Sequence, residues 1–191
     1  MTTQVFLASG SPRRKELLTQ LGYQFELLSI DVEEVHQSHE TPLMYVERLS
    51  KDKAQAGVRA LERTKNKHVP VLGSDTIVVI DGVILEKPKD FEDAKRMLLA
   101  LSGRQHQVMT AVTLATSDDI RTKTVITQVW FRTLSEQEIE QYWESGEPCD
   151  KAGSYGIQGS GGRFVSRIDG SYHAVMGLPL METDQLLHQF L

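Results

Sequence analysis

The sequence predicts an α/β fold, or a mixed α+β fold, in which helices flank one mixed sheet. Short apolar runs alternate along the chain with segments whose apolar residues recur at helical spacing. Two of the apolar runs are joined by Asp81-Gly82, a strong signal for a hairpin and therefore for antiparallel strands. The chain has 191 residues, of which 40% are hydrophobic, and no repeat or linker divides it. We therefore expect a single domain over residues 1–191 with one substantial core.

The first half of the chain is expected to alternate strands with helices. Ser11 is typical of an N-cap and Pro12 of a first helical residue, and leucines follow at helical spacing. Thr41 and Pro42 repeat this signal at the start of a longer helix that contains Lys53. The expected elements are strands over 5–8 and 23–29, a helix that begins at 12, and a helix over 42–61.

The second half is expected to add a hairpin, a long strand pair and three helices. Ser135 and Glu138 form a capping box, and Gly146 closes the helix that follows it. The expected elements are the hairpin at Asp81-Gly82, a helix capped by Asp90 that ends near 102–103, an antiparallel pair over 107–115 and 122–132, the helix after Ser135, a last hairpin after a glycine-rich stretch, and a helix that begins at Pro179.

Composition excludes several classes of protein. The formal net charge is -5, so the overall field does not favour nucleic acid or an anionic membrane surface. The single cysteine, Cys149, excludes an intramolecular disulfide framework and fits a reducing compartment such as the cytoplasm. No apolar run approaches the ~18 residues of a membrane helix, and no export signal precedes the first strand. We expect a cytoplasmic protein whose anion sites are local.

The start of the first helix carries charge of the wrong sign for a free helix end. Arg13, Arg14 and Lys15 occupy the first turn, where unpaired N–H groups and the helix dipole favour acidic residues. A strand, a tight Ser-Gly turn and a helix N-terminus form a geometry that binds phosphate, and guanidinium groups bind phosphate oxygens. We predict a phosphate site here, with Ser11, Arg13 and Arg14 as contacts. The alternative is that both arginines extend into solvent and pair with loop carboxylates.

Asp75 is the second anomaly, because it lies inside the apolar strand pattern VLGSDTIVVI. A buried carboxylate is costly unless it is paired or bound to a metal ion. Gly73 permits the close approach of another backbone or of a ligand, whereas the alternative is that Asp75 only caps a strand end. The loop carboxylates Glu33 and Glu34, with Lys53 and Lys87, complete the inventory of a Mg²⁺-dependent phosphoryl-transfer site, although each alone is typical of a surface residue.

The segments LASGSPRRKELL, LSKDKA, GSDTIVV, LEKP, SGRQHQVMTAV, DKAGSYGIQG and GSYHAVMGLPL, with the Glu34 loop, resemble the Maf family of nucleoside triphosphate pyrophosphatases. The resemblance covers almost the whole chain in the family's order. It implies a Maf fold akin to that of inosine triphosphate pyrophosphatases, an elongated mixed sheet flanked by helices with a cleft between two lobes. It further implies a homodimer, a divalent cation (Mg²⁺ or Mn²⁺), and cleavage of nucleoside triphosphates to the monophosphate and pyrophosphate.

The resemblance also assigns roles by position. The matching active-site residues are Ser9, Arg13, Arg14, Glu34, Lys53, Asp75 and Lys87. Asp75 matches the family's proton acceptor, and Glu34 and Asp75 are expected to hold the cation. The resemblance points for Arg13, Thr76 and Gln158 to the group that acts on dTTP and UTP, including modified forms such as 5-methyl-UTP and pseudo-UTP, rather than on 7-methyl-GTP. The Gln158 amide offers a donor and an acceptor for O4 and N3–H of the base, whereas the alternative is a loop amide bonded to its own backbone.

Departures from the family pattern are small. Ser74 stands where alanine is common, and Gln105 stands where threonine is frequent. His106 and His173 are interpreted as hydrogen-bonded structural residues.

An alternative function is a non-catalytic, nucleotide-binding regulator of cell division. A third reading, binding of RNA or DNA through the arginine helix, is disfavoured by the acidic balance of the chain.

Overall fold

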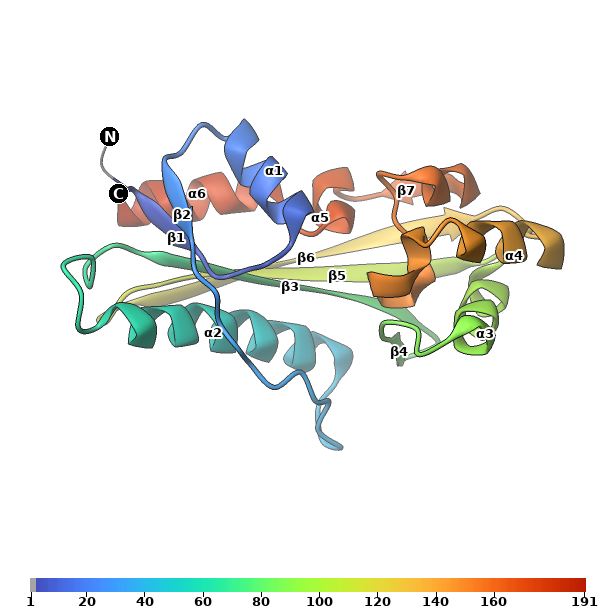
Figure 1. Cartoon of the computed structure of the whole chain (residues 1–191), viewed down its shortest axis with the longest axis horizontal. Coiled ribbons are helices and arrows are strands. Elements are labelled where there is room, and N and C mark those ends of the chain that lie inside the picture. The colour runs from blue at the N-terminus through green and yellow to red at the C-terminus, as the bar shows by residue number, and fades with distance from the viewer. Residues whose placement is uncertain (1–2) are drawn as a thin grey trace. The chain divides into compact units, whose positions relative to one another are not determined.

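Seven strands form one mixed sheet in the computed structural model, which describes residues 3–191 (Figure 1). The strand order is β2-β1-β3-β5-β6-β7, and β4 pairs with β3 outside this path. β1 pairs in parallel with β2 and β3, whereas β4 is antiparallel to β3 and β7 is antiparallel to β6. The strands are β1 (Val5–Leu7), β2 (Phe25–Leu27), β3 (Val71–Ile80), β4 (Val83–Leu85), β5 (Gln105–Ala115), β6 (Ile120–Phe131) and β7 (Val165–Asp169).

Six α-helices accompany these strands within residues 3–191, so the predicted mixed α/β class is confirmed. The helices are α1 (Pro12–Gln20), α2 (Pro42–Leu61), α3 (Phe91–Leu101), α4 (Glu136–Glu144), α5 (Tyr172–Met176) and α6 (Leu180–Phe190). Three short 3-10 turns follow α4, over Glu147–Asp150, Ala152–Ser154 and Ser160–Phe164. No helix in this described part of the chain has both the length and the apolar character that a membrane crossing needs.

The chain groups into two compact units that are interleaved in sequence. Unit 1 holds the residues up to Asp75, 110–125 and 177–191, and unit 2 holds 76–109 and 126–176. Three of the boundaries lie within strands β3, β5 and β6. The single domain over 1–191 stays a prediction, because each unit is assembled from separate segments.

In unit 1, α2 lies on one side of the strands, and α1 and α6 lie on the other (Figure 1). One buried cluster of this unit contains Phe6 and Ala8 at β1, Val71 of β3 and Leu61 at the end of α2. Apolar burial of this kind holds α2 against the strands.

Unit 2 contains the β3–β4 hairpin, α3, α4, β7 and the glycine-rich segment between α4 and β7. Its core includes an aromatic cluster around the Phe131 ring. The rings of His106, Tyr155 and Phe164 lie 5.0, 4.7 and 5.9 Å from it, respectively. This cluster joins the central strands to the glycine-rich segment.

The local signals for element boundaries are confirmed. The four polar N-caps that the sequence predicts each accept a hydrogen bond from the backbone N–H three residues later: Ser11, Thr41, Asp90 and Ser135. Both halves of the capping box of Ser135 and Glu138 are present. Asp81 and Gly82 have φ values of 52° and 77°, as a two-residue hairpin turn with two left-handed residues requires. The strand predicted over 23–29 is shorter, at Phe25–Leu27.

The last hairpin predicted before the C-terminal helix is wrong. β7 pairs with β6, and the residues after it form the short helix α5 instead of a second strand. Gly170 turns the chain with a φ of 134°, and the Ser171 hydroxyl then accepts the N–H of Ala174 at 3.1 Å. This serine cap starts a helix where the apolar residues alone indicated a strand.

Candidate functional site

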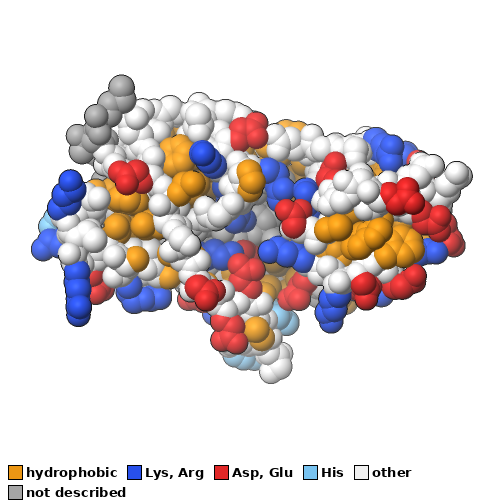
Figure 2. All heavy atoms as spheres, in the orientation of Figure 1, with side chains coloured by type: hydrophobic (Ala, Val, Ile, Leu, Met, Phe, Trp, Pro, Cys, Tyr) orange, Lys and Arg blue, Asp and Glu red, His pale blue; other side chains and the backbone are white. Residues whose placement is uncertain are grey.

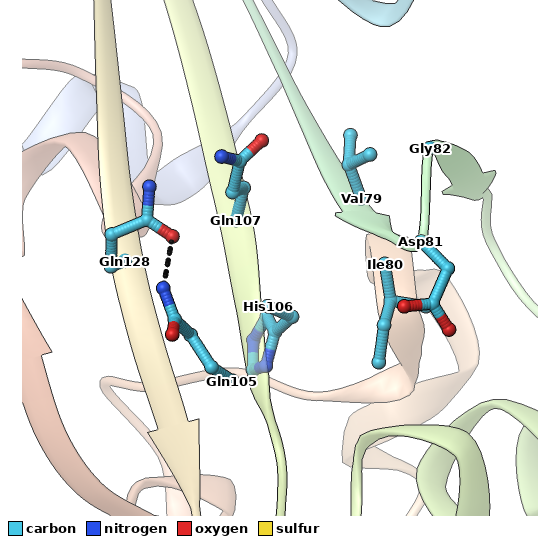
Figure 3. Close-up of a pocket in the computed structure, with 8 residues that line it drawn as sticks. All are labelled: Val79, Ile80, Asp81, Gly82, Gln105, His106, Gln107 and Gln128. Carbon is cyan, nitrogen blue, oxygen red and sulfur yellow. Dashed lines mark hydrogen bonds between the residues drawn. The ribbon is translucent and has the colours of Figure 1, made fainter.

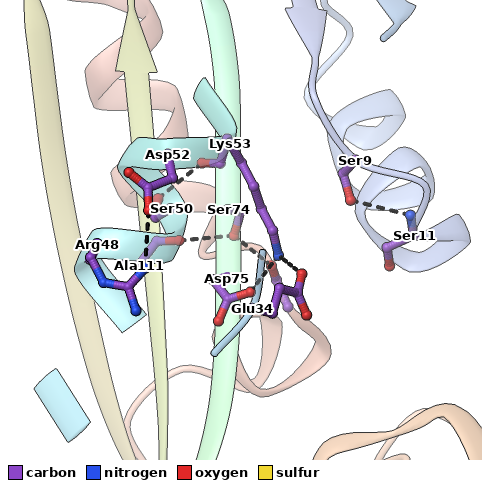
Figure 4. A network of polar contacts seen from close by, with 12 residues as sticks. Ser9, Ser11, Glu34, Arg48, Ser50, Asp52, Lys53, Ser74, Asp75 and Ala111 are labelled. Carbon is purple, nitrogen blue, oxygen red and sulfur yellow. Dashed lines mark hydrogen bonds and ion pairs between the residues drawn. The ribbon is translucent and has the colours of Figure 1, made fainter. Parts of the chain in front are cut away.

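Asp75 of β3 and Lys53 of α2 form a buried ion pair. The Lys53 Nζ lies 2.6 Å from the Asp75 Oδ1, and the two residues are 8% and 6% exposed. Figure 4 shows the lysine side chain reaching from the helix to the carboxylate on the strand. The carboxylate that looked anomalous in an apolar strand is therefore paired, as the cost of burying a charge demands.

Glu34 provides a second carboxylate to the same cation. Its Oε1 lies 2.6 Å from the Lys53 Nζ, and its side chain is more exposed than that of Asp75. Lys53 thus lies between a strand carboxylate and a loop carboxylate (Figure 4). Two acidic groups converge on one ammonium group in unit 1.

Gly73 explains why α2 carries Lys53 so close to the strand. A Cβ at this position would lie 2.5 Å from the Ser50 carbonyl oxygen and 2.6 Å from the Ala54 nitrogen of α2. Side chains two residues apart in a strand point to the same face, so Asp75 also faces α2. Gly73 therefore permits the approach of another backbone, which was one of the two roles that its sequence position indicated.

The loop that carries Glu34 is tied to α2 by two side chains. The Arg48 Nη2 donates to the Val35 carbonyl at 2.9 Å, and the same guanidinium is bonded to the Glu40 carboxylate. The Tyr45 hydroxyl donates to the Glu34 carbonyl oxygen at 3.2 Å. These contacts hold both the start and the end of the acidic loop on the helix that supplies Lys53.

The start of α1 brings Ser9, Ser11 and Arg14 together. The Ser9 Oγ accepts the N–H of Ser11 at 3.2 Å and a bond from the Arg14 Nη1 at 3.4 Å. The Arg14 Nε donates to the Gly177 carbonyl at 2.8 Å. Arg14 is therefore folded back on its own turn and on the segment before α6, rather than extended into solvent. The fully buried Ser74 hydroxyl lies 3.0 Å from the same Gly177 carbonyl.

The charged residues at the start of α1 and those around Lys53 influence one another's pKa values. Burial raises the pKa of Asp75, whereas the cations of Lys53 and Arg14 oppose this rise. Burial lowers the pKa of Arg14, with Arg13 acting in the same direction and Asp75 and Glu34 in the opposite one. The arginine end of α1 and the carboxylate pair therefore share one electrostatic environment within unit 1.

The donor set fits a divalent cation that also binds substrate oxygens. Within residues 3–191 no group of three or more His, Cys, Asp or Glu side chains could hold a metal ion by itself. Mg²⁺ is commonly bound by one or two carboxylates, with substrate phosphates and waters as the other ligands. Glu34 and Asp75, which converge on Lys53, supply two carboxylates of this kind.

The remaining predicted site residues belong to unit 2. Thr76 follows Asp75 on β3 and is half-buried, and Lys87 is exposed two residues after β4. The Gly153 N–H donates to the Glu86 carbonyl at 3.1 Å, which joins the Lys87 strand end to the glycine-rich segment. Gln158 is exposed in that segment. The roles of these residues, like those of the unit 1 residues, stay predictions.

An open hollow of about 270 Å³ in unit 2 is lined by none of the predicted site residues (Figure 3). It lies over the Asp81-Gly82 turn and the ends of the central strands, where the Gln105 amide donates to Gln128 at 2.8 Å. His106 at its wall is buried, and its Nε2 is 2.8 Å from the Tyr155 hydroxyl. Burial lowers the pKa of His106 to about 4, so this imidazole is neutral at pH 7. The structural interpretation of His106 fits these contacts.

Sequence reasoning missed the residues that hold the loops in place. Arg48 and Tyr45 have ordinary helical positions, and their contacts with the acidic loop carry no local signal. Glu147 was also missed; its carboxylate accepts the N–H groups of Ser160 and Gly161 in the glycine-rich segment at 2.8 and 3.0 Å. An acidic residue between a helix-closing Gly146 and Pro148 is a common loop composition.

Comparison with known proteins gives a consistent result across the chain. The profile of a family described as Maf-like protein matches residues 4–190. A protein of Aliivibrio fischeri named dTTP/UTP pyrophosphatase is 91% identical over 191 residues, with 100% of both chains covered. Proteins with the same name from Photobacterium profundum and Vibrio cholerae are 67% and 64% identical, and each comparison covers at least 97% of both chains.

Proposed function

This chain belongs to the family of Maf-like proteins, and from that premise we propose that it is a nucleoside triphosphate pyrophosphatase. The proposed substrates are dTTP and UTP, which are named in its relatives at 64% to 91% identity, and the products are the monophosphate and pyrophosphate. The observation that supports this most directly is the contact of the buried Lys53 with Asp75 and Glu34. Such a cluster combines a base with groups that bind phosphate and a metal ion.

The cations of unit 1 are proposed to bind the triphosphate. The Ser9 turn, the N-terminus of α1, Arg13, Arg14 and Lys53 offer N–H groups and positive charge to phosphate oxygens. Arg14 is held by the Gly177 carbonyl and by Ser9, so little reorganisation is needed when the anion binds. Lys87 in unit 2 is proposed as a further phosphate contact.

Asp75 is proposed as the base. It accepts a proton from a water molecule as the water oxygen bonds to the α-phosphorus and the bond from this phosphorus to the bridging oxygen breaks. The bridging oxygen leaves with the pyrophosphate. Burial raises the pKa of Asp75, which brings the carboxylate closer to the proton affinity that a base needs near neutral pH.

We propose that Glu34 and Asp75 hold Mg²⁺ or Mn²⁺, which neutralises phosphate charge and stabilises the leaving pyrophosphate. Arg13, Thr76 and Gln158 are proposed to determine the choice of pyrimidine. Modified nucleotides such as 5-methyl-UTP and pseudo-UTP belong to the same proposed class.

A substrate panel tests this function. Purified protein with Mg²⁺ or Mn²⁺ should release pyrophosphate from dTTP and UTP faster than from CTP or 7-methyl-GTP, and chelation of the metal should abolish release. Addition of 5-methyl-UTP and pseudo-UTP to the panel identifies the preferred form. Binding of dTTP without any pyrophosphate release would instead support the non-catalytic regulator, which the names of the relatives do not favour.

The partners and the compartment are also proposals. We propose a homodimer, which light scattering can test, and a cytoplasmic location, which the single exposed cysteine supports. Figure 2 shows acidic and basic side chains interspersed over the face in view, rather than one continuous basic surface. Together with the net charge of -5, this pattern does not support nucleic acid as the partner.

A further inference from the structure

The Glu147 carboxylate organises the glycine-rich segment of unit 2. Its Oε1 accepts the Tyr142 hydroxyl at 2.7 Å and the Gly161 N–H at 3.0 Å. Its Oε2 accepts the N–H and the hydroxyl of Ser160 at 2.8 and 2.9 Å. Four donors from the end of α4 and from the segment thus converge on one carboxylate, and hydrogen bonds to a charged acceptor are the stronger kind.

Tyr142 extends this contact to the other end of the segment. Its hydroxyl accepts the N–H of Gly156 at 3.0 Å while it donates to Glu147. The ring is buried and packs edge-on against Phe164, with centroids 4.9 Å apart. The two ends of the stretch 156–161 are therefore joined through a phenol and a carboxylate, and Gln158 lies between them.

Gly159 shows how close the carboxylate lies to the backbone next to Gln158. A Cβ at position 159 would lie 2.5 Å from both carboxylate oxygens of Glu147. Only glycine fits at this distance without displacing the acid. The backbone of the residue that follows Gln158 thus lies against the same carboxylate that binds Ser160 and Gly161.

The donors also keep the acid ionised. Burial opposes ionisation of Glu147, but hydrogen bonds from Gly161, Tyr142 and Ser160 hold its pKa below the ordinary value. The segment is therefore held by a charged acceptor throughout the neutral pH range.

The chemistry of the pyrimidine ring makes this rigidity relevant to specificity. Uracil and thymine present an acceptor at O4 and a donor at N3, whereas cytosine presents a donor at N4 and an acceptor at N3. A glutamine amide carries both kinds of group, so an amide turned by 180° would bind cytosine as well. To discriminate uracil and thymine from cytosine, the protein must hold the Gln158 amide in one orientation. This requires that the backbone around Gln158 keeps the groups next to the amide in fixed positions.

We propose that Glu147 is a positioning residue for pyrimidine selectivity, which fixes the 156–161 segment so that Gln158 presents one orientation of its amide to the base. This inference rests on the proposed hydrolysis of dTTP and UTP, and it adds a residue that does not itself contact the substrate.

The test compares Glu147→Gln with Glu144→Gln, an exposed glutamate on α4 that loses the same charge. In Glu147→Gln, an NH2 group replaces one carboxylate oxygen and faces N–H and O–H groups whose hydrogen bonds that oxygen accepted. The ratio of kcat/KM for UTP to that for CTP should fall about tenfold in Glu147→Gln, the effect of losing one hydrogen bond to a charged group. The ratio in Glu144→Gln should equal that of the wild type.

A second comparison separates positioning from general damage to the fold. If Glu147 acts through Gln158, adding Glu147→Gln to Gln158→Leu should lower the ratio no further. The amide signals of Ser160 and Gly161 in NMR spectra should also shift in Glu147→Gln. Equal losses of kcat/KM for UTP and CTP, with the ratio unchanged, would refute the inference.

Ser160→Ala provides the same test if Glu147→Gln does not fold, because it removes only the hydroxyl donor at 2.9 Å. The UTP to CTP ratio should then fall several-fold, and an unchanged ratio would refute positioning by Glu147. A wild-type protein that releases no pyrophosphate would refute the proposed function. A selective wild type, with Glu147→Gln as selective as Glu144→Gln, would refute this inference alone.

Discussion

The Lys53 ammonium group lies 2.6 Å from the Asp75 carboxylate, so a cation from α2 forms an ion pair with the one acidic residue of β3. Glu34 reaches the same ammonium group from a loop. Burial raises the pKa of the Asp75 carboxylate, whereas its pairing with Lys53 acts in the opposite direction and favours the charged form.

Replacing Asp75 with asparagine should remove the proposed base and one metal ligand without changing side-chain size. We expect turnover of dTTP to fall by about 10³-fold or more, within the range of lost general-base catalysis. Circular dichroism and the melting temperature should show a folded protein, since Glu34 still pairs with Lys53. Asp118→Asn, in the turn before β6, is the matched control. Near-normal turnover in Asp75→Asn would contradict the assignment.

Replacing Lys53 with methionine should destabilise the fold, because it leaves the Asp75 carboxylate buried without its cation. Removal of one partner of a buried pair costs about 3 kcal/mol. The double variant Lys53→Met/Asp75→Asn should recover part of this loss, since the unpaired charge is gone. Urea unfolding of the four proteins measures the coupling. Additive losses would show that the two side chains do not depend on each other.

Replacing Arg48 with methionine should loosen the loop that carries Glu34. The guanidinium contacts the Val35 carbonyl and the carboxylates of Glu40 and Asp52, all of which are lost. We expect KM for dTTP to rise about tenfold, the effect of losing one charged hydrogen bond. Hydrogen exchange over residues 33–40 should become faster. Arg59→Met, exposed on the same helix, should leave both measurements unchanged.

Replacing Gly73 with alanine should force α2 away from β3. The added Cβ would meet backbone atoms of α2 at 2.5 to 2.6 Å, and backbone cannot move as a flexible side chain does. We expect a loss of about 3 kcal/mol in the free energy of unfolding, at the upper end of overpacking effects. Gly10→Ala is the control, since nothing lies within 4 Å of a Cβ there. Equal stability of the two variants would show that the helix contact is not tight.

His106 should make stability depend on pH in mild acid. Burial lowers its pKa to about 4 in the folded state, so between that pH and about 6.5 the unfolded chain binds more protons. The stabilisation is present above the unfolded pKa and is lost as the pH falls towards 4, by up to about 3 kcal/mol. The free energy of unfolding of the wild type relative to His106→Asn should shrink over this range. The same substitution at the exposed His68 is the matched control for the change in side chain.

Helix caps and turns that depend on residues adjacent in sequence could be predicted from the sequence. The caps at Ser11 and Ser135 and the turn at Asp81-Gly82 depend on groups within a few residues, so their signals are local. The final hairpin was predicted wrongly because the Ser171 cap lies after a turn that the apolar pattern does not reveal.

The site could be predicted only in part for the same reason. Asp75 was found because a carboxylate is out of place in an apolar strand. Its contact with Lys53 depends on how α2 lies on β3, and residue types alone do not specify that register. Lys53 and Glu34 were indicated by their combination with other charged residues and by family resemblance, and the contacts of Arg48 and Glu147 had no local signal. Contacts between distant segments depend on packing that a single sequence does not display.

The boundaries between the two units could not be predicted from the sequence for another reason. Three of them fall inside the strands β3, β5 and β6 rather than in loops between elements. A search for linkers therefore could not find them.

The interleaving of the units has a consequence for synthesis and for protein engineering. Every segment of unit 2 has been synthesised by residue 176, whereas unit 1 still needs 177–191, with α6 and the Gly177 carbonyl that holds Arg14. The half of the molecule that carries the Lys53 and Asp75 pair is thus the last to be completed during translation. A cut in the chain after residue 75 would divide unit 1, whereas every segment of unit 2 lies in the fragment 76–191. A stop codon after residue 176 would remove α6 and Gly177 from unit 1 and leave every segment of unit 2 in the chain.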